Sequence, residues 1–250
     1  CMGLTVFDYE NDGDPDLFQG NDHQKNFLFR NNGDLTFSEV AVQAGVAVNS
    51  NGTPTGSMHG SIADMDGDGL VDLLVTDLRY GAMYRYIGEG LYKDITGESG
   101  IARHFSGKGQ WGAIFIDYDN DGDPDIFTAN GTAEELILQP PLLLENDGSG
   151  NYNNAGPRLG EYFRGKRSGR GAATIDFDYV GVMDIVVSHV DLERNAVLLK
   201  NELKNGNHWL GLTLRGREGV GPEIGARVSV KTENNEQTLV YQWATTYLSY

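Results

Sequence analysis

The stretch "DYDNDGDPDI", Asp117–Ile126, places five aspartates within ten residues. So much like charge opposes folding, because two unit charges ~4 Å apart repel by about 1 kcal/mol in water and by about 4 kcal/mol at an effective dielectric of 20. Carboxylates stand at positions one, three, five and nine of this loop, glycine stands at position six, and position seven offers its main-chain carbonyl. Calcium takes six to eight oxygen ligands, so the spacing predicts a calcium-binding loop.

Nearly the same loop recurs along the chain. Copies begin at Asp8, Asp64, Asp117 and Asp176, and their starts are 56, 53 and 59 residues apart. A period of this length indicates a stacked or circular array, and it matches four short strands with their connections. We call these nine-residue segments the first to fourth aspartate loops, and we expect each repeat to form one four-stranded blade of a β-propeller.

Three of the four aspartate loops carry a full set of oxygen donors. The predicted calcium ligands are Asp8, Glu10, Asp12, Asp14, Asp16, Asp64, Asp66, Asp68, Leu70, Asp72, Asp117, Asp119, Asp121, Asp123 and Asp125. In the fourth loop Val180 replaces the carboxylate at position five and leaves Asp176, Asp178 and Asp184. We therefore expect about three calcium sites, with the fourth loop binding weakly or not at all.

The loops also resemble two other structures, an EF-hand and a solvated acidic turn. An EF-hand needs a bidentate glutamate at position twelve and a helix on each side, whereas position twelve is Gln19, Val75 or Thr128 and the flanks are short β-type runs. A solvated acidic turn explains one such loop, since Asp and Gly are common turn formers. Three copies with the same ligand offsets favour calcium binding.

The composition limits the classes of partner. The chain has 19 Lys and Arg against 36 Asp and Glu, which gives a net charge of -17 and argues against nucleic acid and anionic membranes. No apolar run approaches the ~20 residues of a membrane span, and a single cysteine excludes an internal disulfide. The 34 glycines and the short apolar runs favour short strands and tight turns.

A glycine-rich strand precedes each aspartate loop, as in "CMGLTVF" and "QWGAIFI". Such small residues suit strands that approach one another closely near a central axis. Gly60 lies one residue nearer to its loop than Gly3, Gly112 and Gly171 lie to theirs. This offset predicts a shifted strand register in the second repeat.

The aspartate loops and their flanks resemble the FG-GAP/VCBS repeats of integrin-α-type β-propellers. The resemblance covers residues 1–200, as three complete repeats and part of a fourth, and it implies calcium in the D-x-D-x-D-G-x-x-D hairpin and a seven-bladed ring. Because a closed propeller needs at least four blades, we expect further blades upstream of Cys1.

Residues 201–250 follow a different pattern. "NHWLGLTLRG", Asn207–Gly216, and "IGARVSV", Ile224–Val230, resemble the start of the ASPIC/UnbV domain that follows such repeats in the cartilage acidic protein family. The sequence thus predicts an all-β chain, with propeller blades over residues 1–200 and a small, incomplete β domain over residues 201–250.

The histidines, the basic residues and three aromatic residues give weaker functional signals than the aspartate loops. The five histidines are scattered and no G-x-S-x-G elbow occurs, so no catalytic residue is predicted. The basic tract Arg164–Arg170 is either a docking site for an acidic ligand or an ordinary solvated loop. Trp111, Tyr118 and Tyr162 are either sugar-stacking platforms or packing residues.

These observations favour a secreted, non-catalytic scaffold for binding, adhesion or assembly, with calcium clasping each blade hairpin. An extracellular or periplasmic place fits, because millimolar calcium outside cells fills weak sites. The partner is expected to be a protein or a glycan. Two alternatives stay open, a calcium-dependent polysaccharide lyase or hydrolase and a subunit of a larger extracellular complex.

Overall fold

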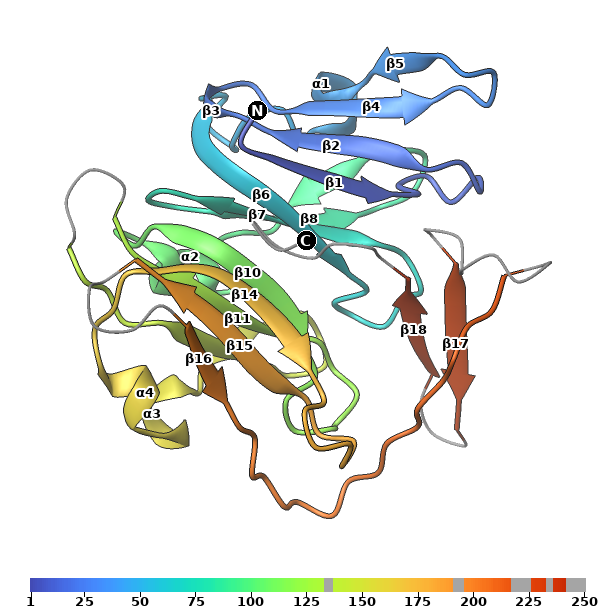
Figure 1. Ribbon diagram of the computed structural model, residues 1–250. Coiled ribbons are helices and arrows are strands. Elements are labelled where there is room, and N and C mark those ends of the chain that lie inside the picture. Colours follow the sequence, from blue (N-terminus) through green and yellow to red (C-terminus); the bar gives the residue numbers. More distant parts are fainter. Residues whose placement is uncertain (133–136, 191–195, 217–225, 233–235, 242–250) are drawn as a thin grey trace.

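The computed structural model describes residues 1–132, 137–190, 196–216, 226–232 and 236–241. Within them the chain forms successive antiparallel sheets joined by short connections, as the ribbon diagram shows (Figure 1). Four short helices lie in the connections between sheets: α1 Ala41–Ala44, α2 Ile101–Phe105, α3 Gly156–Leu159 and α4 Glu161–Arg164. The predicted all-β class is confirmed.

The first three repeats each form an antiparallel sheet that contains four strands of that repeat, and we call each repeat's sheet a blade. The first blade has the order β1 Gly3–Phe7, β2 Asp16–Gly20, β4 Phe27–Asn31 and β5 Phe37–Glu39. The second has β6 Thr55–Ala63, β7 Asp72–Asp77, β8 Ala82–Tyr86 and β9 Tyr92–Asp94, with β3 Asp22–Gln24 added beside β6. The third has β10 Gln110–Ile116, β11 Asp125–Asn130, β12 Leu142–Asn146 and β13 Tyr152–Asn154.

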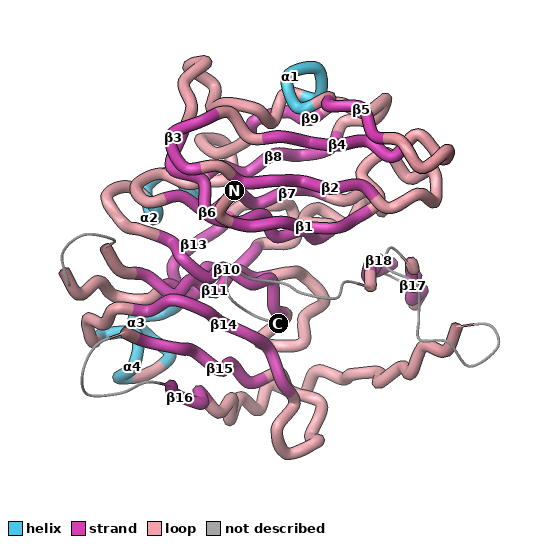
Figure 2. Tube along the Cα trace, turned by 45° about the horizontal axis from the view of Figure 1, so that its top comes forward, coloured by secondary structure: helices cyan, strands magenta, loops and turns pink. Residues whose placement is uncertain are grey.

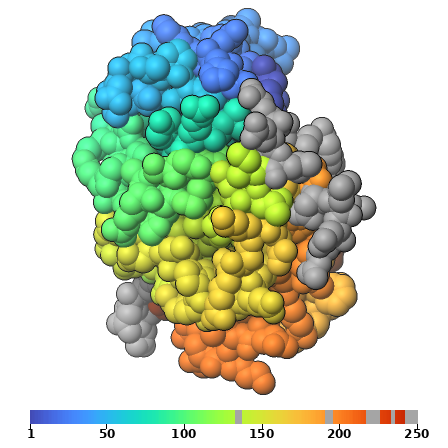
Figure 3. Space-filling model, turned by 90° about the vertical axis from the view of Figure 1, so that its left-hand side faces the viewer, coloured from blue at the N-terminus to red at the C-terminus, as the bar shows by residue number. Residues whose placement is uncertain are grey.

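The fourth blade has three strands in the described residues: β14 Gly169–Ile175, β15 Asp184–His189 and β16 Ala196–Leu199. The first strands of successive blades lie side by side, since β1 contacts β6, β6 contacts β10 and β10 contacts β14 (Figure 2). Segments that follow one another in the sequence accordingly form successive bands down the molecule (Figure 3). This arrangement is that of propeller blades around an axis, while the number of seven blades stays a prediction.

Three apolar cores fill the spaces between neighbouring blades. Leu73 packs in the core shared with the first blade, and the next residue, Leu74, packs in the core shared with the third. Successive side chains of a strand point to opposite faces, so a strand between two blades is buried on both faces and its central residues are apolar at consecutive positions. This explains why the apolar residues fall in short continuous runs.

The glycine-rich strands do approach closely. A Cβ on Gly3 would lie 2.4 Å from the carbonyl oxygen of Met58, and one on Gly112 would lie 2.6 Å from that of Arg170. The predicted register shift in the second repeat is wrong, because Ala63 pairs with Asp72 just as Ile116 pairs with Asp125. The buried His59 instead takes the place that glycine holds in the other repeats.

The C-terminal part forms a hairpin of β17 Arg227–Lys231 and β18 Glu236–Val240. Arg227 donates a hydrogen bond to the carbonyl of Gly69 in the second aspartate loop, and Asn205 donates to the carbonyl of Asp119 in the third. The segment after residue 200 thus contacts the loop end of the blades. The predicted domain boundary at residues 200 and 201 stays a prediction, and Ile224 lies outside the described residues.

No helix in the described parts of the chain is both long and apolar enough to cross a membrane.

Candidate metal centres

Each aspartate loop is folded around the carboxylate at position one. In the third loop, Asp117 accepts hydrogen bonds from the backbone N–H groups of Asp121 (3.1 Å) and Gly122 (3.0 Å). In the fourth, Asp176 accepts the same two bonds from Val180 and Gly181, each at 2.9 Å. The position-six glycines all have a positive φ, from 79° to 100°, a backbone conformation that glycine adopts at little cost.

The carboxylate at position nine joins the loop to two strands. Its Oδ2 accepts from the backbone N–H of position two. Its Oδ1 accepts from the backbone N–H of the residue two positions beyond the third-strand residue that pairs with position ten. For Asp125 these donors are Tyr118 (3.2 Å) and Asn146 (2.8 Å). The same pair of bonds reaches Asp16, Asp72 and Asp184. All four loops therefore share one backbone geometry.

In two loops the carboxylates at positions one, three and nine converge. Oxygen atoms of Asp64, Asp66 and Asp72 lie within 4.8 Å of one another, and so do those of Asp117, Asp119 and Asp125. Hard anionic oxygens at this spacing suit a calcium ion.

Some of these oxygens also lack a hydrogen-bond partner. The buried Oδ1 atoms of Asp64, Asp66 and Asp119 have none among the described residues. A buried polar oxygen without a partner is costly, so these atoms fit a cation that would coordinate them.

The other predicted ligands lie outside these two groups. Within the described chain, the groups contain neither the first-loop trio Asp8, Glu10 and Asp16 nor any residue at position five or seven. The position-five side chains Asp68 and Asp121 instead accept the backbone N–H of position seven in their own loops. Ligand roles for all of these residues stay predictions.

Residues 8–75 and 64–128 match the family model of the FG-GAP-like repeat. These stretches contain the first three aspartate loops. The chain carries FG-GAP-like repeats. The resemblance that the loops predicted is thereby confirmed, while the fourth loop lies beyond the matched residues.

Cartilage acidic protein 1 of Xenopus tropicalis is 26% identical to this FG-GAP-repeat chain over 247 residues, and the human protein is 25% identical over 243 residues. Each match covers 93% of this chain and 35% of the relative, so the chain spans about a third of the length of these curated relatives.

Solved structures also resemble the chain. A lectin of Agrocybe aegerita that recognises non-reducing terminal N-acetylglucosamine aligns with a TM-score of 0.48 and 18% identity, over 91% of this chain and 56% of the lectin. The V. cholerae biofilm matrix protein Bap1 aligns with a TM-score of 0.37 and 19% identity, over 74% of this chain and 34% of Bap1.

The fourth repeat keeps its loop without the complete ligand set. Asp176 and Asp184 make the same backbone bonds as their equivalents, and Asp178 forms an ion pair with Lys200, with 2.7 Å between Oδ2 and Nζ. Tyr179 stands at position four with φ 57°, where the other loops have Asn or Gly. Backbone hydrogen bonds thus account for Asp176 and Asp184, whereas Asp178 has only the ion pair and a buried Oδ1 without a hydrogen-bond partner among the described residues.

The aspartate loops are also tied to the next blade. The amide of Asn146, in the third blade, donates to the carbonyls of Pro124 (3.2 Å) in its own loop and of Met65 (2.9 Å) in the second loop. Asn201 of the fourth repeat likewise donates to Tyr118 (2.6 Å) in the third loop. The sequence did not single out these asparagines, although each is the second residue after the apolar run of a third strand.

Two basic residues of the tract Arg164–Arg170 pack against aromatic candidates, while Arg164 and Lys166 are exposed. Arg170 stacks on Trp111, with 4.5 Å between the guanidinium carbon and the ring centroid, and donates to the carbonyl of Thr132. Arg167 stacks on Tyr162 at 4.9 Å. Trp111 and Tyr118 are buried, so neither presents its ring face to a sugar.

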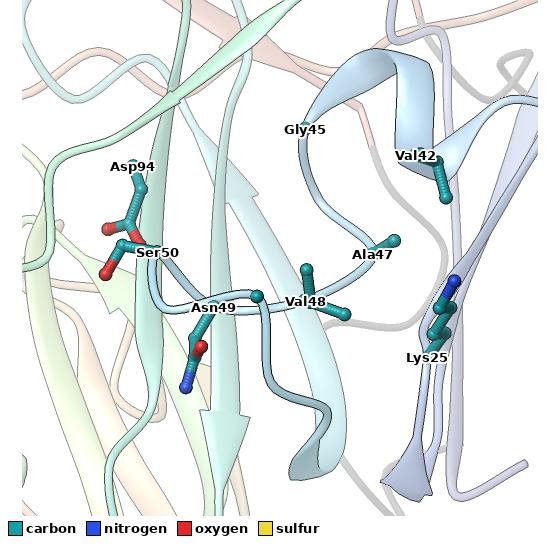
Figure 4. Close-up of a pocket in the computed structure, with 9 residues that line it drawn as sticks. Lys25, Val42, Gly45, Ala47, Val48, Asn49, Ser50 and Asp94 are labelled. Carbon is teal, nitrogen blue, oxygen red and sulfur yellow. The ribbon is translucent and has the colours of Figure 1, made fainter.

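A hollow of about 220 Å³ lies where the connection after the first blade meets the second blade (Figure 4). Its lining residues are Lys25, Val42, Gly45, Ala47, Val48, Asn49, Ser50, Gly52 and Asp94. Sites for drug-sized ligands are typically about 300–1,000 Å³, so this hollow suits a single side chain or sugar unit. It includes no member of the aspartate loops.

Burial raises the pKa of the position-nine carboxyls in the first three repeats. The pKa is about 7 for Asp16 and Asp72 and about 8 for Asp125, with loss of hydration as the main cause and backbone hydrogen bonds opposing it. In the calcium-free protein these groups are partly protonated near neutral pH.

We expect calcium-free protein to lose stability as the pH rises from 6.5 to 8. Asp16, Asp72 and Asp125 bind protons in the folded state over this range, whereas an unfolded Asp titrates near ~3.9. The unfolded state therefore binds fewer protons, and the free energy of unfolding falls with pH. Thermal melts of resin-stripped protein measure the trend, and a melting temperature that rises over this range would contradict it.

Replacing Asn146 by Ala should cost about 2 kcal/mol more in unfolding free energy than replacing Asn31 by Ala. Asn31 is the matched control, because its amide donates to the Pro15 carbonyl of its own loop but to no earlier blade. Urea unfolding of both variants measures the difference. Equal losses would show that the bond from Asn146 to Met65 adds nothing.

Proposed function

We propose that this chain is a calcium-stabilised, non-catalytic binding scaffold that works outside the cytoplasm. The observation that carries the proposal is the convergence of three carboxylates in each of two loops, where buried carboxylate oxygens lack hydrogen-bond partners among the described residues. The converging residues are Asp117, Asp119 and Asp125 in the third loop and Asp64, Asp66 and Asp72 in the second. Calcium there would neutralise the converging charge and hold each hairpin in its folded geometry.

The donor set favours calcium among divalent ions. All the donors are hard oxygens on a pliant loop, and magnesium demands a stricter octahedral arrangement at shorter distances. The position-five carboxylates and position-seven carbonyls lie in the same loops and would complete the coordination shell. An extracellular place follows from the millimolar calcium found there.

The position of His189 and its neighbours favours binding over catalysis. Tyr162 Oη and His189 Nε2 are hydrogen-bonded at 2.9 Å, and Arg167 stacks on the tyrosine ring. His189 ends β15, the strand that Asp184 begins, so it lies about 17 Å along the strand from the fourth loop. A calcium-dependent lyase or hydrolase needs such groups beside the metal.

The partner is proposed to be a protein or a glycan. It would contact the end of the blades opposite the aspartate loops, because the loops concentrate negative charge and are covered in part by the segment after residue 200. The hollow that Lys25 and Asp94 line lies among the connections of that opposite end (Figure 4).

Removing calcium should lower the melting temperature strongly. A site that calcium fills at a hundred times its Kd adds about 2.7 kcal/mol, which is about 5–10 °C for a domain of this size. Asp119→Asn should remove one site and part of the shift, whereas Asp178→Asn in the fourth loop should leave the shift unchanged. Identical melting curves with calcium and with chelator would refute the proposal.

A second candidate role, as a subunit of a larger assembly, is favoured by the outer faces of the first and fourth blades. Leu4 and Phe37 are 50% and 47% exposed on the first, and Ile175 and Leu198 are 41% and 39% exposed on the fourth. In the middle blades the corresponding faces are buried in the cores between blades. Exposed apolar faces of this kind mark interaction sites.

This role predicts association through the two outer faces. Light scattering after size-exclusion chromatography should give a mass above that of one chain, and Leu4→Lys with Leu198→Lys should return it to the monomer mass. Val42→Lys, at an exposed apolar residue of α1, is the control. A monomer mass at every concentration would sink the proposed self-association.

A further inference from the structure

One structural position differs in charge between the third repeat and the others. In each repeat, the residue after the position-nine aspartate pairs with a residue of the third strand. The next residue along that third strand is Arg30, Arg85, Glu145 and Lys200 in the four repeats in turn. Each also precedes the residue whose N–H bonds that aspartate. The four side chains are therefore equivalent, and we call this place the flanking position.

Where the flanking residue is basic, it reaches the position-three carboxylate. Arg85 Nε lies 2.9 Å from Asp66 Oδ2, and Arg30 Nε lies 3.9 Å from Glu10 Oε1. In the fourth repeat, Lys200 makes the equivalent pair with Asp178. In the first two loops these carboxylates, Glu10 and Asp66, are predicted calcium ligands. A basic side chain therefore lies beside a carboxylate that calcium would bind.

The third repeat reverses this charge. Glu145 is held by Arg158 and by the hydroxyl of Tyr118, which donates to Oε2 at 3.2 Å. Asp119, at position three, has no ion pair in the described part of the chain, whereas Asp66 and Asp178 each have one. The buried Oδ1 atoms of all three aspartates lack a hydrogen-bond partner there, so the repeats differ in the ion pair alone. Calcium binding at the third loop would therefore not have to displace an ion pair, within the described residues, from the position-three carboxylate.

We propose that the flanking residue sets the calcium affinity of its loop: Arg85 competes with calcium for Asp66, whereas Glu145 leaves Asp119 free, so the third loop fills before the second. This inference rests on the calcium-binding function proposed above. It also explains the fourth loop, in which Lys200 takes the place of a metal beside Asp178. Competition is expected because a cation near a carboxylate must be displaced, or repels the metal, when calcium binds.

The first experiment titrates calcium into the stripped full chain by calorimetry, in an Asp119→Asn background that silences the third loop. Arg85→Gln should tighten binding at the second loop by about fivefold, the factor expected for removing one screened unit charge. Arg79→Gln is the matched control, because this exposed arginine lies just beyond the opposite end of β7. It should leave the affinity unchanged.

The second experiment reverses the charge in the third repeat, in an Asp66→Asn background. Glu145→Lys should weaken calcium binding by about fivefold or more. Glu145→Gln controls for the lost contact with Arg158 and should weaken binding less. An equal loss in both variants would mean that Glu145 acts as a structural anchor, which overturns the proposal.

A third pair of variants tests the proposal independently if the Arg85 or Glu145 variants fail to fold. Val180→Asp restores the missing carboxylate on the exposed fourth loop, and Val180→Asp with Lys200→Gln should bind one additional calcium about fivefold more tightly than Val180→Asp alone. The inference is overturned if Lys200→Gln leaves the calcium affinity of the Val180→Asp chain unchanged and Arg85→Gln leaves that of the Asp119→Asn chain unchanged. If the unaltered chain binds no calcium at all, it is the proposed function that fails.

Discussion

The hydrogen bonds from backbone N–H groups to the position-one and position-nine carboxylates of each aspartate loop support the rest of the structure. The position-one aspartate closes the turn, and the position-nine aspartate joins it to the third strand. Because these bonds are charge-assisted, they fold the loop even in the fourth repeat, where Val180 replaces a ligand. The strand register follows from them, since all four hairpins start at the same pair.

This way of folding a loop gathers negative charge, and the molecule compensates for it in three ways. Burial raises the pKa of Asp16, Asp72 and Asp125, so that protons take part of the charge. Arg85 and Lys200 form ion pairs with position-three aspartates. The remaining open oxygens suit a divalent cation, which connects the stability of the fold to the proposed calcium binding.

Much of the fold and the candidate site was predictable because both are local. The offsets of Asp, Gly and apolar residues within one repeat specify the turn, the hairpin and the type of metal donor. The register in the second repeat was not predictable from Gly60, because His59 fills the close-packed place at the axis. The packing roles of Trp111 and Arg170 were equally hidden, since these side chains meet only where the third and fourth blades pack together.

The sequence by itself determined an all-β chain of repeated blades with oxygen-rich hairpin loops, because the strands and loops are encoded by neighbouring residues and the blades by the regular spacing of the loops. Only the tertiary structure decided which carboxylates converge, which pair with a basic side chain, and how Asn146 ties one blade to the loop of another. The physical reason is distance along the chain. Glu145 and Asp119 lie in different strands and turns, and their relation depends on the strand pairing that the folded sheet sets.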